Sequence, residues 1–473
     1  SWDVSTTNGA IAIDEDSAMA IAGISTSGTL SLTTTGALTQ SGAIGAGAVT
    51  VSASGQAVTL THTSNAMTSV DITGADIDVT DSNGIDIAAI TSGTTLDVIA
   101  GDAITDSGTM AVSGAATFTT KKAGGAAITL DQSGVHGFSS VKAETFTDDG
   151  TTPAAGAITI DEASAMTIAG LTTTSTVSLT TTGAITDTGD IAAGAITINT
   201  TGGSNAAARA VTIAGETTNA TSWDVSTTNG AIAIDEDSAT DLAAITTTGN
   251  LSVVSAGSVT DSGVVSVGGT TGVTVATTEN VILDSANTFT GAMTLTAGDG
   301  GGVTAFGNVT IKNSTAVKLD DNSALAAGDL YLNAGTDGAV GGDLSIISGG
   351  AITQGIQLGV SGSASFKTLN DTPAGITLSN ASNTFGAITA QARNAADGDD
   401  VAGSITISEG AAMAIADIST TGTLSLTTTG ALTQSGAIDA GAVTVSAGAN
   451  NVTLTNTSNA MTSVDITGAN IAV

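Results

Sequence analysis

The chain has 473 residues, and 43 acidic against 8 basic side chains give it a formal net charge of −35. Aromatic residues make up only 2% of the sequence and charged residues 11%, whereas glycine contributes 61 residues. Thr, Val and Ile favour pleated strands and Gly favours tight turns, so the composition argues against a helical enzyme and predicts a nearly all-β chain. So few cations also argue against nucleic acid and anionic membrane surfaces as partners.

The apolar stretches are too short for membrane insertion as a helix. Mean hydropathy is +0.34, but Thr, Ser, Gly or Asp interrupts every apolar run well before the roughly 18 residues that a spanning helix needs. The absence of cysteine removes disulfides and thiolate metal sites. It fits an exported bacterial protein that gains its stability from repetition.

Internal duplications run through the chain. Residues 1–18 return unchanged at 222–239, and residues 9–79 closely resemble residues 403–473. A related segment begins at Gly156. We therefore expect a single continuous solenoid over residues 1–473, built of imperfect repeats.

Short alternating pairs of aliphatic residues recur along the chain. In chain order, the first strands are expected around residues 11–13, 30–32, 49–51, 58–60, 70–72, 77–79, 85–87 and 96–98. Strands this short, with almost no aromatic side chains, cannot fill a sandwich core, but they can stack on copies of themselves. The pattern predicts a right-handed parallel β-helix with roughly 20 residues per coil. About 23 coils at the spacing of paired strands would form a rod on the order of 110 Å long.

Two motifs punctuate the expected strands. In the first, an aliphatic pair is followed by a turn and then by a third aliphatic residue, which precedes Thr and then Asp or Gln. The third aliphatic residues are Leu38, Ile104, Ile185, Val259, Ile352 and Leu432. In the second motif, alternating aliphatic residues precede a turn asparagine, in segments that begin at Val58, Val281, Ile376 and Val452.

Several runs carry a family resemblance. GALTQSGAIGAGAVTV, GAITDTGDIAAGAITI, NASNTFGAIT and VDITGADIDVTDSNG resemble repeats of large bacterial exoproteins of the filamentous haemagglutinin type. The resemblance implies a β-helical adhesin that is secreted or displayed on the cell surface, and many such proteins travel by two-partner secretion. We therefore expect a structural segment of an extracellular filament or adhesin shaft. Its expected partners are identical or neighbouring copies stacked end to end, and a host-surface, cell-surface or glycan receptor.

The rhythm of the repeats also suggests where the solenoid projects and how it continues. Residues 121–156, 201–230 and 391–403 depart from the rhythm and are expected to form projecting loops, where recognition would occur. The first 18 residues match an internal segment, and the last 13 match residues 67–79, which continue in the first copy. We therefore expect a window of a longer β-helix, or a protomer that stacks on identical copies.

Calcium is the one cofactor with candidate ligands in the sequence. The hard-oxygen candidates are Asp76, Asp78, Asp81 and Asn83. In the duplicate, Asn470 and Ala472 replace the first two, and the acidic run 14–16 becomes Ser-Glu-Gly at 408–410. A metal needed at each copy would retain its ligands. The sequence therefore favours solvated turn acids and no cofactor, with structural calcium as the alternative.

Neither histidine predicts catalysis. His62 becomes Asn456 in the duplicate, which indicates a surface turn. His136 lies near potential partners, but a catalytic triad is defined by its geometry, and Ser and Asp are frequent throughout this chain. The neighbours of His136 considered for such a set are Asp131, Ser133, Ser139 and Lys142. We expect no catalytic residue.

Two alternative functions remain open from the sequence. A polysaccharide lyase or hydrolase needs clustered cations, or paired carboxylates with aromatic platforms, but the cations here are scattered and Trp2 and Trp223 belong to the duplicated segment. The Thr triplets at 33–35, 180–182, 246–248 and 427–429 suggest hydroxyl ladders that could bind ice or an ordered glycan. Their spacing is uneven, and outward Thr also follows from β propensity alone.

Overall fold

The strands of the protein stack as the coils of a parallel solenoid. The computed structural model describes residues 1–132, 136–202, 209–215, 217–298, 305–334 and 338–473. Over these residues it contains 49 strands and no helix, and its parallel coils repeat about every 20 residues over about 23 turns. None of the described segments is a helix long and apolar enough to cross a membrane. The predicted all-β parallel solenoid is confirmed.

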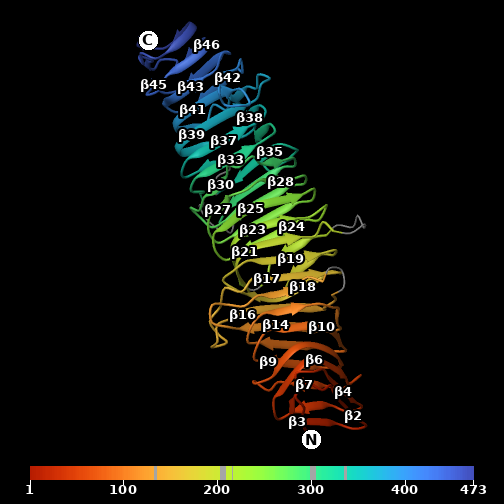
Figure 1. Cartoon of the computed structure of the whole chain (residues 1–473). Coiled ribbons are helices and arrows are strands. Elements are labelled where there is room, and N and C mark those ends of the chain that lie inside the picture. Colours follow the sequence, from red (N-terminus) through yellow and green to blue (C-terminus); the bar gives the residue numbers. More distant parts are fainter. Residues whose placement is uncertain (133–135, 203–208, 216, 299–304, 335–337) are drawn as a thin grey trace. The chain divides into compact units, whose positions relative to one another are not determined.

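The chain forms two compact units, residues Ser1–Glu236 and Asp237–Val473, and strands within each unit are labelled in Figure 1. The strands of the first unit are β1 Trp2–Ser5, β2 Ile11–Glu15, β3 Met19–Ser25, β4 Leu30–Thr34, β5 Leu38–Gln40, β6 Ile44–Ser52, β7 Val58–Leu60, β8 Ala66–Gly74, β9 Ile77–Asp81, β10 Ile85–Ser92, β11 Leu96–Ala100, β12 Ile104–Asp106, β13 Met110–Val112, β14 Ala115–Lys121, β15 Ile128–Leu130, β16 Ser140–Phe146, β17 Ile158–Glu162, β18 Met166–Thr172, β19 Val177–Thr181, β20 Ile185–Asp187, β21 Ile191–Asn199, β22 Val211–Ile213, β23 Thr218–Ser226 and β24 Ile232–Glu236. The strands of the second unit are β25 Thr240–Thr247, β26 Leu251–Ser255, β27 Val259–Asp261, β28 Val265–Val267, β29 Thr271–Val275, β30 Val281–Leu283, β31 Thr288–Phe289, β32 Met293–Ala297, β33 Val309–Asn313, β34 Val317–Leu319, β35 Asp329–Asn333, β36 Ala339–Val340, β37 Leu344–Ser348, β38 Ile352–Gln354, β39 Gly359–Leu369, β40 Ile376–Leu378, β41 Thr384–Arg393, β42 Ile405–Glu409, β43 Met413–Ser419, β44 Leu424–Thr428, β45 Leu432–Gln434, β46 Ile438–Ser446, β47 Val452–Thr453, β48 Ala460–Thr467 and β49 Ile471–Ala472.

Each coil is a set of short strands that pairs with the coils on both sides. In the first unit, Leu30 of β4 lies in register with Ile11 of β2 and with Val49 of β6. Side chains alternate between the two faces of a strand, so residues two apart both point inward. Leu30 and Leu32 are accordingly buried. The inward aliphatic residues of successive coils therefore stack on one another, as the sequence predicts.

A few aromatic side chains enlarge this aliphatic core. Phe118 and Phe138 meet edge to face in the first unit, with ring centroids 5.9 Å apart. Phe366 and Phe385 make a similar contact in the second unit at 6.0 Å. Such pairs add to the stabilisation that burial alone provides.

A glycine at the corner after the first motif leaves no space for a side chain. A Cβ atom at Gly108 would lie 1.6 Å from the carbonyl oxygen of Ala88, and one at Gly436 would lie 1.7 Å from that of Ala416. Consecutive coils therefore approach through bare backbone at this corner, which explains the glycine two residues after the Asp or Gln in five of the six motifs; Gln354 is instead followed directly by Gly355.

The segments expected to project contain strands as well as loops. Residues 121–156 include β15 and β16, and residues 201–230 include β22 and β23, with residues 133–135, 203–208 and 216 outside the described part. In residues 391–403, β41 ends at Arg393, which forms an antiparallel bridge with Asp400. The Arg393 guanidinium also lies 2.6 Å from the Asp400 carboxylate, which ties this loop at its base.

Candidate functional site

The four calcium candidates do not converge. Asp81 is buried, and its carboxylate accepts the backbone N–H groups of Met67 at 2.6 Å and Asn83 at 2.8 Å. Asp78 is half-buried within strand β9, where it lies in register with Asp97 of β11 in the next coil. Among the residues that the structure describes, no group of three or more His, Asp or Glu side chains could hold a metal ion.

His62 is a turn residue, and its replacement in the duplicate performs the same task. The Nδ1 atom of His62 accepts the backbone N–H of Ser64 at 3.2 Å. In the second copy, Oδ1 of Asn456 accepts the backbone N–H of Ser458 at 2.9 Å. The structure therefore supports the interpretation of His62 as a turn position.

His136 is buried with a partner that its sequence neighbours do not reveal. Its Nε2 atom lies 2.7 Å from Oδ2 of Asp106, and both side chains are fully buried. Its Nδ1 atom accepts the backbone N–H of Met110 at 3.3 Å. These contacts assign a neutral ring with the proton on Nε2. Because both nitrogens are occupied, neither is available to activate Ser139, and Ser133 lies outside the described residues.

Within the part of the chain that the structure describes, the Asp106–His136 contact is one of five equivalent corners. In each, the Asp or Gln that ends the first motif binds a buried Asn or His in the next coil. The pairs, with the distance between the side-chain atoms, are Gln40–Asn65 at 2.9 Å, Asp106–His136 at 2.7 Å, Asp261–Asn287 at 2.7 Å, Gln354–Asn383 at 3.1 Å and Gln434–Asn459 at 2.9 Å. Both sequence motifs thus meet at one place in the fold.

The same Asn or His also binds the backbone of the preceding coil. Its acceptor atom takes the N–H of the residue four positions after the Asp or Gln. These N–H donors are Ile44 at 2.8 Å, Met110 at 3.3 Å, Val265 at 2.8 Å, Leu358 at 2.8 Å and Ile438 at 3.0 Å. His136 therefore reproduces the pattern of an asparagine side chain, with Nδ1 in the place of Oδ1 and Nε2–H in the place of the amide N–H.

A third side chain joins the corner from the following coil. It accepts a backbone N–H two residues beyond the Asn or His, except at Glu236, where the donor Ala220 follows Thr218. These contacts are Met67 to Asp81 at 2.6 Å, Phe138 to Glu162 at 3.1 Å, Ala220 to Glu236 at 3.1 Å, Phe289 to Asn313 at 3.0 Å and Phe385 to Glu409 at 2.8 Å. Buried polar side chains can therefore connect three successive coils, and we call this place in the coil stack, with whichever of these side chains it holds, a polar corner.

Burial raises the pKa values of several acidic side chains in the polar corners. It raises the pKa values of Glu162 and Glu409, against the N–H bonds that stabilise their charged forms. Burial likewise raises the pKa of Asp261, although Asn287 and two backbone N–H groups oppose this shift. A buried charge without full pairing is costly, so burial disfavours the charged form of each of these three acids.

The two tryptophans show how the same sequence behaves in two environments. Trp223 is buried, and its indole N–H donates to Oε2 of Glu236 at 2.9 Å. Trp2, in the identical segment, is 38% exposed. The equivalent acid Glu15 accepts a bond from the hydroxyl of Ser17 instead. Trp223 is thus a core residue of a polar corner and not a sugar-binding platform.

The threonine triplets do not stack on one another. In residues 427–429, Thr427 points outward, Thr428 is buried with its hydroxyl on the carbonyl of Ala411, and Thr429 continues into the turn. The outward neighbours of Thr427 are Ser408 and Ser446. Together with the next column, they form an uncharged patch, the hydroxyl face, which consists of Ser404, Thr406, Ser408, Thr423, Ser425, Thr427, Thr444 and Ser446.

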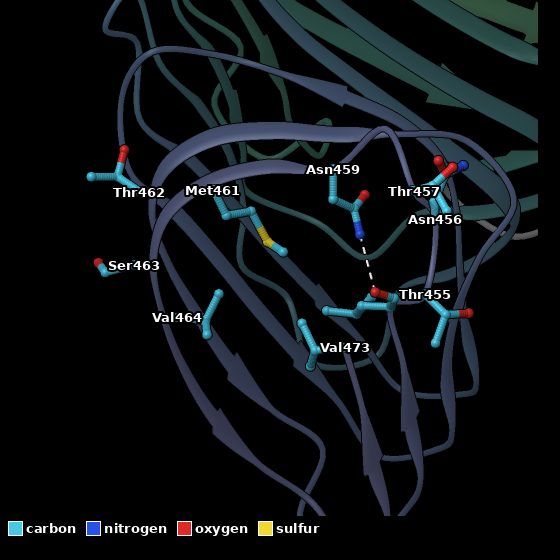
Figure 2. A pocket seen from close by; sticks show the side chains of 10 residues that line it. Thr455, Asn456, Thr457, Asn459, Met461, Thr462, Ser463, Val464 and Val473 are labelled. Carbon is cyan, nitrogen blue, oxygen red and sulfur yellow. Dashed lines mark hydrogen bonds between the residues drawn. The ribbon is translucent and has the colours of Figure 1, made fainter.

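One open pocket is an uncovered face of the core. Its volume is about 580 Å³, and Figure 2 shows Asn459, Met461, Val464 and Val473 among its side chains. Val464 is 47% exposed, whereas its counterpart Val70 in the first copy is buried beneath the next coil. The pocket therefore gives no indication of a ligand site.

These features define the protein as a parallel β-solenoid whose coils are fastened by buried polar corners. A family model described as repeats of unknown function (DUF5649) matches residues 8–73, 74–141, 229–296, 306–391 and 402–467, and the chain belongs to this family. No curated protein and no solved structure matched. Each matched repeat contains one complete Asp/Gln–Asn/His pair, so the polar corner recurs with the family repeat.

Proposed function

We propose that this chain is a structural segment of an extracellular bacterial filament or adhesin shaft. The observation that carries the proposal is the recurrence of the polar corner, once in every matched repeat. A binding or catalytic site is usually built once in a protein, whereas a fastening that returns with each repeat serves the coil stack itself. The resemblance to filamentous haemagglutinin-type repeats supports the bacterial surface as its location.

The polar corners would make the shaft resist opening of single coils. Pulling one coil away exposes or orphans the Asn or His, its Asp or Gln partner and two backbone N–H groups. A buried polar group left without its partner costs about 1–3 kcal/mol, so each corner adds several such terms to the loss of apolar contacts. The net charge of −35 would keep neighbouring shafts dispersed in ordinary salt. Further coils or copies with the same cross-section are the partners that suit the ends of such a stack.

Electron microscopy and single-molecule pulling of the purified chain test this proposal together. We expect elongated particles, and stepwise unfolding whose lowest-force step shifts to the altered repeat in the Asn383→Leu variant. Thr384→Val, at an exposed position beside that corner, is the matched control and should leave the force pattern unchanged. Compact particles, or a force pattern that Asn383→Leu does not alter, would contradict a load-bearing role. Fractionation of the producing bacterium adds a second check, because recovery in the cytosol alone would rule out a surface shaft.

The hydroxyl face supports a second candidate, the binding of an ordered neutral glycan. Its eight hydroxyl groups carry no charge on a strongly acidic chain, and they repeat at the spacing of paired strands, about 4.8 Å. Retention on insoluble neutral polysaccharides, lost in the Ser425→Asp/Thr427→Asp variant, would favour this function. Thermal hysteresis that the same substitutions abolish would instead indicate ice binding.

A further inference from the structure

The third position of the polar corner accommodates two kinds of side chain, a carboxyl group and an amide. At Asp81 and Glu236, both carboxylate oxygens accept N–H donors; for Glu236 these come from Ala220 and the indole of Trp223. At Asn313, Oδ1 accepts the N–H of Phe289, and Nδ2 donates to the carbonyl of the same residue at 3.2 Å. The corner can therefore use either a charged double acceptor or a neutral group that accepts and donates.

Glu162 and Glu409 occupy the same third position, but only one of the two oxygens in each carboxyl group has a hydrogen-bond partner. Each is almost completely buried, with 0% and 2% exposure. Oε1 of Glu162 accepts the N–H of Phe138, and Oε1 of Glu409 accepts that of Phe385. In both residues, Oε2 is buried and has no hydrogen-bond partner among the described groups. A carboxylate would leave charge on an oxygen that nothing stabilises.

The surroundings of Glu409 contain no compensating cation. The strands that carry and flank it, β40, β42 and β44, hold no other titratable residue. Arg393 lies at the far end of β41, where it pairs with Asp400, and Asp417 belongs to β43. The corner beside Glu409 is therefore electrically neutral apart from the glutamate itself.

Glu162 lies in a more charged region, but none of the charged side chains there pairs with it, and its Oε1 also accepts the hydroxyl of Ser164 at 3.1 Å. His136 is committed to Asp106, and Lys142 pairs with Glu144 at 2.8 Å on β16. Asp161, its neighbour on β17, points to the opposite face. Asp131 lies in the same corner and donates its backbone N–H to Asp106. The free oxygen of Glu162 therefore lacks a cationic partner as well.

We propose that Glu162 and Glu409 are neutral carboxylic acids in the folded coils, which replace the amide of Asn313, and that their ionisation loosens the polar corner as pH rises. The proton sits on Oε2, the position at which Nδ2 of Asn313 carries its donor hydrogens. Loss of this proton replaces a donor with a second acceptor and creates an unpaired buried charge. The device is an alkali-sensitive latch within the solenoid, and it does not depend on the proposed function.

The direction of the pH effect follows from the shift. Burial raises the pKa of both glutamates in the folded chain above the value in the unfolded chain. Their contribution to stability is therefore fully present below the unfolded pKa and is lost as pH rises through the folded pKa.

Infrared spectroscopy tests the protonation state directly. At pH 6, where exposed carboxyl groups are ionised, we expect a band of protonated carboxyl in the wild-type chain that is reduced in Glu162→Gln and in Glu409→Gln, and most in the double variant. Equal spectra of the wild type and the double variant at pH 6 would overturn the proposal.

Unfolding measurements add a readout that a merely structural glutamate would not produce. Glu409→Gln should keep or raise the denaturation midpoint at pH 8 and reduce its dependence on pH. The matched control Glu236→Gln should lower the midpoint, because one of its two accepting oxygens becomes a donor that faces N–H groups. Asn313→Asp should make the midpoint more sensitive to alkali. If Glu409→Gln lowers the midpoint as much as Glu236→Gln, Glu409 is ionised and the latch is refuted.

Discussion

Two polar corners make equivalent hydrogen bonds with different side chains. One contains Gln354 and Asn383, and the other contains Asp106 and His136. In both corners, the Gln or Asp side chain accepts a hydrogen bond from the Asn or His side chain of the next coil. That buried Asn or His in turn accepts a backbone N–H of the preceding coil. The two corners use different residue types, but their donors and acceptors occupy the same positions. The comparison teaches that the fold specifies hydrogen-bond polarity at this corner, because an unpaired buried polar group is costly, while the identity of the residue can vary.

Adding a methyl group at the corner glycine should have the largest effect, at Gly108 in the corner of Asp106 and His136 and at Gly436 in the equivalent corner of Gln434 and Asn459. Gly108→Ala and Gly436→Ala would each place a Cβ atom within 1.7 Å of a carbonyl oxygen in the preceding coil. Because backbone on both sides must shift, we expect a loss of about 3 kcal/mol or more in the free energy of unfolding. Denaturant unfolding provides the measurement. Gly272→Ala, in a strand where the new Cβ would meet no atom closer than 4.0 Å, is the spatial control, and an equal loss there would show that steric overlap is not the cause.

Removing the polar centre of either corner should have the next largest effect. Asn383→Leu and His136→Leu leave a backbone N–H unpaired in the interior and remove one hydrogen-bond partner of Gln354 or Asp106. We expect each to destabilise its repeat by on the order of 3 kcal/mol. Hydrogen exchange of Leu358 and Met110, whose N–H groups lose their acceptors, should accelerate. Unchanged protection at these two amides would show that the corner does not fasten the coils.

The acid of a corner should make its repeat sensitive to pH, whereas glutamine should not. Burial raises the pKa of Asp261 in the folded chain, so the stability associated with its neutral form is present at low pH and is lost as pH rises through the folded pKa. Local exchange around Asn287 should therefore increase from pH 5 to pH 8, corrected for the intrinsic rate. The corner of Gln434 and Asn459, in which no acid takes part, is the control. An equal change in both repeats would attribute the effect to the net charge of the chain.

Exchanging the centre of one corner for that of the other should cost little. His136→Asn retains an acceptor and a donor, and the Asp261–Asn287 pair shows that aspartate and asparagine are compatible partners. The smaller side chain gives up the stacking of His136 on Phe138, whose ring centroids are 6.0 Å apart. We expect a loss of about 1 kcal/mol, well below that of His136→Leu. Equal losses in the two variants would mean that volume, and not hydrogen bonding, decides this position.

Chelation should have the smallest effect. The carboxylate of Asp81 accepts backbone N–H groups, and Asp78 lies within strand β9. Excess chelator should therefore change the thermal midpoint by no more than about 1 °C. A drop of many degrees would reveal a metal that stabilises the folded chain by mass action.

Much of the architecture was predictable because side-chain alternation is a local property. The aliphatic pair Ile11 and Ile13 predicts β2, and Leu30 and Leu32 predict β4, since residues two apart share the buried face of a strand. The sequence also locates both members of four of the five Asp/Gln–Asn/His pairs, as the Asp or Gln of one motif and the Asn of the other. It did not reveal His136 as a corner residue, because its loop lacks the asparagine that marks the other corners.

The sequence by itself determined the all-β composition, the strands, the inward-facing residues and the order of the repeats, because these depend on local spacing and propensity. Only the tertiary structure decided which polar side chains meet. Asn65 follows Gln40 by 25 residues, whereas His136 follows Asp106 by 30, because the intervening coils differ in length. Stacking places both pairs at equivalent corners, where the exclusion of water requires every donor to find an acceptor.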